Sequence, residues 1–151
     1  MLTKLPSQRW SPRMADHLLF RAGFGGDPTR RKALFELGKS GGVEAAVDSL
    51  LGGTLPWDDH PVPQIPIDDR SVAYDREQRY AFVGWFVRQM HELPPVPVKM
   101  FKFFVDHFPI DRDVLARPQI YEQFYGHFDI LRRGALGNFR ELVKAVSWSA
   151  G

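Results

Sequence analysis

Residues 94–108, PPVPVKMFKFFVDHF, form the stretch that decides the fold. Three prolines interrupt the chain at its start, and they are followed by a run of helical length. Within that run only Lys99, Lys102, Asp106 and His107 are polar, and four of the other residues are phenylalanine. Side chains this apolar belong inside a folded protein. The stretch therefore predicts a helix that is a packing centre for the helices on either side of it.

The N-terminal third of the chain has clear helix-start signals. Ser11 and Asp27 each precede a proline, and this pairing is typical of a helix N-cap followed by a first-turn proline. Gly38 predicts a helix end. We therefore expect three short helices in residues 11–52, after an N-terminal arm of residues 1–10.

Residues 53–70 separate this block from the rest, and their four prolines and four aspartates predict a long loop. A long helix is expected from about residue 71 to residue 93. It is apolar almost all round between Tyr80 and Val87, which predicts a central position. The Phe-rich helix comes next. Two more helices complete residues 71–151, and Asn138 caps the last of them.

No stretch of the chain alternates between apolar and polar residues for long, so no strands are expected. We predict an all-α fold of six or seven helices with one long Pro-rich loop and little or no sheet. Its length of 151 residues suits one packed domain over residues 1–151.

The amino-acid composition argues against several classes of function. Twenty basic residues nearly balance 18 acidic ones, so no strong field points to nucleic acid or to anionic lipid. The absence of cysteine excludes disulfides, thiolate zinc sites and a cysteine nucleophile. No segment approaches the roughly 20 apolar residues of a membrane span, and residues 1–14 lack the apolar core of a secretory signal. We expect no nucleic-acid partner, no membrane span, and a cytoplasmic location unless an export signal has been removed.

The candidates for chemistry are few. Asp106 and His107 are neighbours on one helix and point about 100° apart, so they do not form a dyad with each other. His107 is either a general base or single metal ligand, or a C-terminal helix residue that covers apolar surface. His91, His107 and His127 could meet where their helices pack. The five histidines never have the i, i+3 or i+4 spacing of a local zinc motif, and we predict no metal and no cofactor.

Three weaker signals have structural interpretations. Residues 23–26, GFGG, follow a helix rather than a strand, so we interpret them as a helix–helix turn and not as a phosphate loop. Arg132 and Arg133 begin a basic patch that no aromatic-interleaved groove extends. Asp58 and Asp59 could hold calcium with other aspartates of the loop, but they lack EF-hand spacing and suit solvated turns.

Three segments resemble, in this order, one large bacterial family. They are HLLFRAGFGGDPTRRKALFELGKSGGVEAAVDSLL (17–51), VRQMHELPPVPVKMFKFFVDHF (87–108) and ILRRGALGNFRELVKAVS (130–147). The family is the bacterial domain of unknown function number eighteen hundred. The resemblance implies a helical fold and assigns no activity. Family members are generally several times longer, so the resemblance covers their N-terminal portion.

One departure from the family pattern concerns the candidate site. Family members generally have Trp-His-x-His-Phe where this chain has residues 104–108, FVDHF. The first histidine of that pattern is Val105 here, and only His107 remains. The resemblance implies that any metal or acid–base function of the histidine pair is lost in this chain.

Two function hypotheses follow. The favoured one is a helical interaction or assembly subunit without catalytic equipment. A protein partner or a second copy would cover the apolar face of its last helix, made of Phe139, Leu142, Val143, Val146 and Trp148. The alternative is the N-terminal fragment of a hydrolase-like or metal-dependent enzyme that other residues complete. Its candidate catalytic residues are His107, Asp106, His91 and His127. The sequence favours the non-enzymatic role and leaves the other open.

Overall fold

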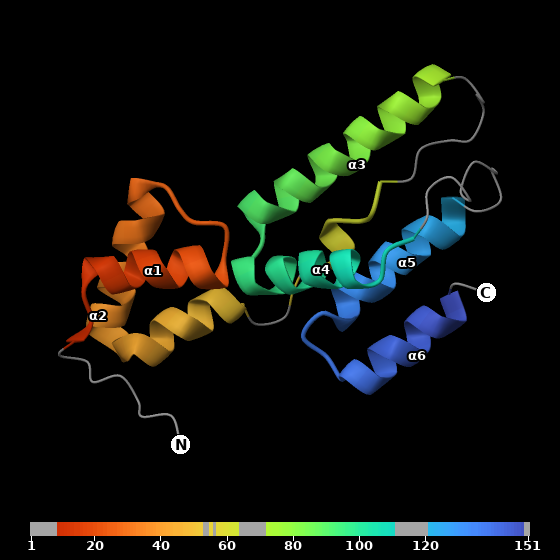
Figure 1. The fold of residues 1–151 in the computed structure, drawn as a ribbon. Coiled ribbons are helices and arrows are strands. Elements are labelled where there is room, and N and C mark those ends of the chain that lie inside the picture. The colour runs from red at the N-terminus through yellow and green to blue at the C-terminus, as the bar shows by residue number, and fades with distance from the viewer. Residues whose placement is uncertain (1–8, 53–54, 56, 64–71, 111–120, 150–151) are drawn as a thin grey trace. The chain divides into compact units, whose positions relative to one another are not determined.

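The structure is a computed structural model that describes residues 9–52, 55, 57–63, 72–110 and 121–149. The helices are α1 (Pro12–Ala22), α2 (Pro28–Leu51), α3 (Val72–Glu92), α4 (Pro95–His107), α5 (Tyr121–Gly134) and α6 (Phe139–Ser149), with a short 3-10 helix η2 (Trp57–Asp59) between α2 and α3 (Figure 1). No strand occurs in these residues. The prediction of an all-α fold with six or seven helices is confirmed.

The predicted helix caps are present at three helix starts. The Ser11 side chain accepts a hydrogen bond from the Met14 amide at the start of α1 (3.4 Å). Asp27 accepts from the Arg30 amide before α2 (2.8 Å). Before α6, Asn138 Oδ1 accepts from the Arg140 amide (2.9 Å). Each cap satisfies an amide that the helix itself leaves without a partner.

The helix end predicted at Gly38 is wrong, and α2 continues through it. A Cβ atom on Gly38 would lie 2.5 Å from the indole ring of Trp10, so this glycine makes room for a large side chain. Trp10 is fixed there because its Nε1 donates to the Phe35 carbonyl (3.0 Å). The break in α2 comes instead at Gly42, where φ is 83°. Only glycine adopts this φ readily.

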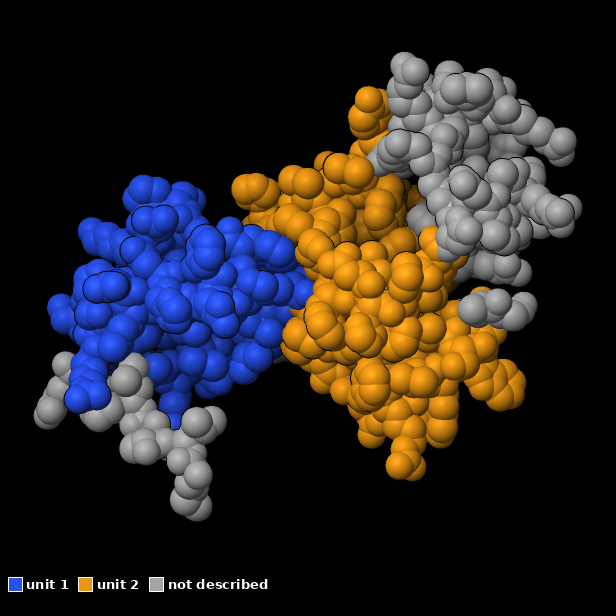
Figure 2. All heavy atoms as spheres, in the orientation of Figure 1, with its two compact units in different colours: residues 1–55, 94–99 blue, residues 56–93, 100–151 orange. Residues whose placement is uncertain are grey.

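Contacts divide the chain into two compact units, which Figure 2 colours separately. Unit 1 contains residues 1–55 and 94–99, and unit 2 contains residues 56–93 and 100–151. Each unit is described by itself. The prediction that the whole chain packs as one domain stays a prediction.

Unit 1 is built on the packing of α1 against α2. Its buried core consists of Ala15, Leu19, Leu34, Ala46 and Leu50. Lys99, from the first turns of α4, closes the C-terminal end of α1. Its ammonium donates to the carbonyls of Phe20 (3.3 Å), Arg21 (2.9 Å) and Gly23 (2.8 Å). The carbonyl groups at the end of α1 and at Gly23 thus bind a cation. An anion-binding loop would instead present amide groups at this position.

Unit 2 is centred on the Phe-rich helix, as predicted. The fully buried Phe101 of α4 contacts Trp85 and Phe86 of α3, with ring centroids 6.0 and 5.5 Å apart. It also meets Phe128 of α5 edge to face at 6.3 Å. One side chain of α4 therefore joins the aromatic residues of the helices before and after it.

Between Tyr80 and Val87, where its side chains are described, the helix α3 is covered on one face. Phe82, Trp85 and Phe86 pack against the core of unit 2. On the other face Tyr80 and Val87 are 68% and 46% exposed. The apolar residues of this segment are therefore not all buried, and the central position expected for the helix stays a prediction.

Candidate functional site

The candidate residues at the end of α4 lie on the surface. Asp106 forms an ion pair with Lys102, one helical turn earlier (2.5 Å). The exposed His107 ring stacks on Phe103, with centroids 5.4 Å apart and planes 16° apart. Stacking of this kind is what the interpretation of His107 as a residue covering apolar surface requires.

His127 is buried in unit 2, close to the end of α4 and to α6. Its Nε2 lies 3.0 Å from the Phe108 carbonyl, which can only accept, so Nε2 carries the proton. Its Nδ1 lies 3.5 Å from the Ser149 hydroxyl, which donates to the Val146 carbonyl (2.9 Å). Burial lowers the pKa of His127 below its ordinary 6.5, although the bond to Phe108 acts in the opposite direction. A neutral His127 thus ties α5 to the chain at the end of α4 by one hydrogen bond and lies beside Ser149 of α6.

His91 lies exposed in the last turn of α3. Among the residues that the structure describes, no three His, Asp or Glu side chains gather into a group that could hold a metal ion. The interpretation of His107, Asp106, His91 and His127 as catalytic residues stays a prediction, as does the enzyme fragment to which it belongs.

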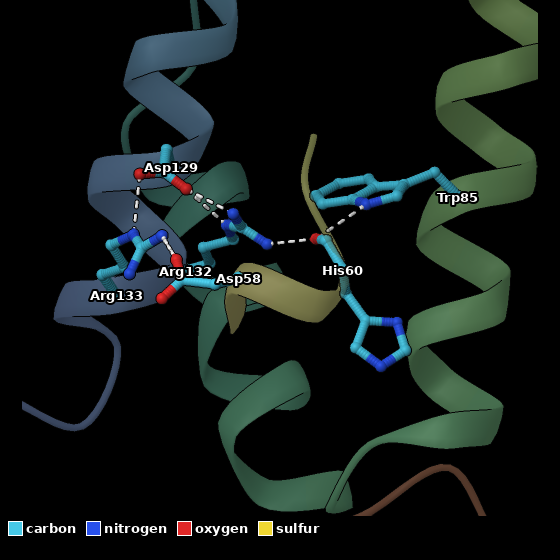
Figure 3. A network of polar contacts seen from close by, with 6 residues as sticks. All are labelled: Asp58, His60, Trp85, Asp129, Arg132 and Arg133. Atoms are coloured by element: carbon cyan, nitrogen blue, oxygen red, sulfur yellow. Dashed lines mark hydrogen bonds and ion pairs between the residues drawn. The ribbon is translucent and has the colours of Figure 1, made fainter. Parts of the chain in front are cut away.

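Six of the described residues form a network of polar contacts that we call the arginine network: Asp58, His60, Trp85, Asp129, Arg132 and Arg133 (Figure 3). The three residues from α5 are spaced i, i+3 and i+4, so they share one face of that helix. Asp58 comes from η2, His60 follows it, and Trp85 comes from α3. The network therefore joins three elements of unit 2.

Arg132 is the centre of this network and is only 3% exposed. Its Nε and Nη2 donate to Asp129 Oδ1 at 2.7 and 2.5 Å, and its Nη1 donates to the His60 carbonyl at 2.5 Å. The rings of Trp57 and Trp85 lie 5.5 and 5.8 Å from the guanidinium carbon. Partners of these kinds compensate a buried guanidinium for its lost water.

A second arginine shares the same carboxylate. Arg133 Nε donates to Asp129 Oδ2 at 2.8 Å, and its Nη2 pairs with Asp58. Burial alone would raise the pKa of Asp129, but the hydrogen bonds and charges of Arg132 and Arg133 outweigh it and hold that pKa below its ordinary 3.8. The hydrogen bond to Asp58, and after it the bond to Asp129, raises the pKa of Arg133. Asp129 and Arg133 are therefore both charged throughout the physiological pH range.

The contacts of the arginine network are suited to holding elements of unit 2 together. The Asp129 carboxylate is bound on both oxygens, and Figure 3 shows the Arg132 guanidinium directed at Asp129 on one side and at the His60 carbonyl on the other. The network binds the segment after η2 to α5, because Arg132 donates to the His60 carbonyl. It also binds this segment to α3, because Trp85 Nε1 donates to the same carbonyl (3.4 Å).

Sequence reasoning placed Arg132 and Arg133 in a basic surface patch and assigned Asp58 to a solvated turn. The signal that could have found the network is the spacing of Asp129 to both arginines on one predicted helix.

The face predicted for α6 is divided by the structure. Leu142 and Val146 are 3% and 9% exposed and belong to the core of unit 2, so they are not available to a partner. Phe139 and Trp148 are 57% and 85% exposed. They are nine positions apart, which places them about 180° apart round the helix. The prediction of one continuous face is therefore wrong, because the fold itself covers its middle.

Phe139 instead continues a row of rings on α4. Its ring lies 6.1 Å from that of Phe104, which lies 5.3 Å from that of Phe103, on which His107 stacks. We call these four residues the aromatic ladder. Phe104 is buried at 7% exposure, whereas Phe103 and Phe139 are 51% and 57% exposed. The ladder is an apolar surface that extends from α4 to α6, and its exposed rings rest on the buried Phe104.

None of the helices in the described residues is both long and apolar enough to cross a membrane. The model of a family described as "Protein of unknown function (DUF1800)" matches residues 17–150. No curated protein and no solved structure matches the chain. The family match confirms the resemblance of the three segments quoted above. The chain therefore belongs to the DUF1800 family of proteins of unknown function.

Proposed function

We propose that this chain is a helical protein-interaction subunit, and that the aromatic ladder is the surface on which a partner docks. The observation that carries the proposal is the exposure of Phe103 and Phe139. Each is more than half exposed, although Phe139 stacks on the buried Phe104 and Phe103 meets it edge to face. Soluble monomers rarely leave a contiguous apolar surface open to water unless it has a binding role.

The ladder has the properties of a binding hot spot. Fully burying an exposed phenylalanine side chain is worth about 1.5–3 kcal/mol, and covering Phe103 or Phe139 would contribute about half of that, because each is already about half buried. Both rings project from helices that pack on the core of unit 2, so binding would cost little ordering entropy. An apolar segment of another protein is the partner that matches this surface.

The surroundings of the ladder resemble the polar rim of an interface. Lys102 and Asp106 pair with each other on α4, one turn from the rings. On α6 the exposed Arg140 follows Phe139 directly, and Lys144 pairs with Glu141 (3.0 Å). A polar rim round an apolar centre is the usual composition of a protein–protein interface.

The test is the binding of an environment-sensitive hydrophobic dye by the purified full chain. We expect bound-dye fluorescence that Phe103→Ser and Phe139→Ser each reduce and that the double variant removes. The matched control is Phe20→Ser, because Phe20 is 74% exposed but lies in unit 1, away from the ladder residues in sequence and core.

Circular dichroism of each variant checks that the helices remain. A wild-type chain that binds no dye would overturn the proposal. Equal losses in Phe20→Ser and Phe139→Ser would overturn it as well, because the ladder would then have no special role.

A further inference from the structure

A second apolar surface runs along α3. Tyr80, Gly84 and Val87 are exposed and follow one another at i, i+4 and i+7, so they share one face of the helix, with the 52% exposed Val83 at its edge. We call these four residues the α3 stripe. It points away from the core-facing side chains, such as Phe82, on the same helix.

Nothing in the described part of the chain explains Gly84. A Cβ atom built on it meets no atom of the described residues within 4 Å, so no close packing among them requires a glycine there. After proline, glycine is the least favourable residue in a helix interior. Alanine at this position would fit the chain and strengthen the helix. A glycine on an exposed apolar face is useful where a second helix comes close to the backbone, since the separation of two packed helices depends on the side chains at the contact.

We propose that the α3 stripe pairs with the α3 stripe of a second copy of this chain, antiparallel and with the two Gly84 residues at the symmetry axis. In such a pair, residues four positions before and four positions after Gly84 face each other. Tyr80 then lies opposite Arg88 of the second copy, and the contact occurs twice because the interface is two-fold.

The exposed groups are complementary in this register. The Tyr80 ring and the Arg88 side chain are 68% and 70% exposed, and Arg88 has a long ion pair to Glu92 at 4.0 Å. A guanidinium over a tyrosine ring is attractive. A parallel pair would instead set Arg88 against Arg88. Charge complementarity therefore selects the antiparallel arrangement and favours a second copy as the occupant.

One helix on each side makes a small interface, and small interfaces are weak and depend on concentration. The inference does not depend on the aromatic ladder, since the two surfaces share no residue. Loss of dye binding at the ladder and loss of association through α3 are separate results of separate experiments.

The experiment is analytical ultracentrifugation of the full chain over a range of concentrations, for the wild type, Gly84→Ala, Gly84→Leu and Gly126→Ala. Gly126 is the matched control, because it lies inside α5, is exposed, and has open space where a Cβ would be. We expect both alanine variants to unfold at higher temperature when dilute. Only Gly84→Ala should weaken self-association, by about tenfold or more, because two methyl groups separate the helices at the axis. Gly84→Leu should abolish it.

The opposite signs of the Gly84→Ala effects, a more stable monomer and a weaker dimer, distinguish an interface role from general damage. A wild-type chain that remains monomeric up to its solubility limit would overturn the proposal. So would self-association that Gly84→Leu leaves unchanged; if Phe139→Ser then abolished it, the contact would belong to the ladder.

Discussion

Arg132 and Asp129 form an ion pair one helical turn apart on α5, with Nε···Oδ1 at 2.7 Å, although the arginine is almost completely buried. Arg133 reaches the other oxygen of the same carboxylate from the solvent side (2.8 Å), with its side chain 45% exposed. The two arginines thus share one partner and differ in burial, which makes them a natural comparison.

We expect Arg132→Met to lower the free energy of unfolding by about 3 kcal/mol. Removing one partner of a buried pair costs roughly 3–5 kcal/mol, and the 37% exposure of the Asp129 side chain favours the lower end. Arg133→Met should cost about 1 kcal/mol or less, as exposed pairs do. Urea denaturation of both variants checks this. Equal losses would mean that Arg132 does not hold unit 2 together.

Lys99 is expected to stabilise the end of α1. Its three hydrogen bonds to carbonyls, at 2.8, 2.9 and 3.3 Å, suggest a loss of about 1.5 kcal/mol in Lys99→Met, the lower end for bonds to a charged group because the site is partly open to water. The measurement is hydrogen exchange at the Gly23 and Gly25 amides, which donate to the Leu19 carbonyl at 3.0 and 3.2 Å.

The matched control for Lys99 is Lys102→Met. Lys102 lies on the same helix and pairs with the exposed Asp106 one turn later, so its loss should cost about 0.3–0.5 kcal/mol. Faster exchange of the Gly23 and Gly25 amides in Lys102→Met, but not in Lys99→Met, would contradict the assignment.

Several residues show which features of the fold can be predicted from the sequence and which cannot. Local signals were sufficient for the helix starts, because Ser11, Asp27 and Asn138 act within three residues of themselves. They failed at Gly38, where the reason for a glycine is Trp10, a residue 28 positions away whose ring occupies the space of a side chain. The sequence alone does not distinguish a glycine that ends a helix from one that makes room for a neighbouring side chain.

The surfaces were harder to predict than the helices. Leu142 and Phe139 have the same apolar character on one predicted stripe, and only tertiary packing decides that the first is buried and the second exposed. For the same reason Arg132, which sequence composition places on the surface, is in fact enclosed by Trp57 and Trp85. The match to a family of unknown function supplies no site residues that would correct these errors.

His127 is expected to make the protein less stable in mild acid. Its pKa in the folded state is lowered by burial, so the unfolded chain binds a proton more readily, and stability falls as the pH decreases below the unfolded value of about 6.5. The loss continues until the folded pKa is passed. Above pH 6.5 the contribution of His127 is complete.

The measurement for His127 is the urea midpoint between pH 7.5 and pH 5, a range of about 2.5 units that brackets the ordinary histidine pKa. His127→Gln, whose amide can still donate to Phe108, should flatten the pH dependence. The exposed His107→Gln is the control and should leave it unchanged. An identical slope in the wild type and His127→Gln would show that another group is responsible.

The most direct test of the interaction role is hydroxyl-radical footprinting of Phe103 and Phe139 in intact cells that make the protein, compared with the dilute purified chain. Phe20, the most exposed phenylalanine of unit 1, is the internal reference. We predict that oxidation of Phe103 and Phe139 is several-fold lower in cells than in dilute solution, while oxidation of Phe20 changes little. Equal oxidation of the ladder residues in both conditions would contradict the proposal that a partner covers them.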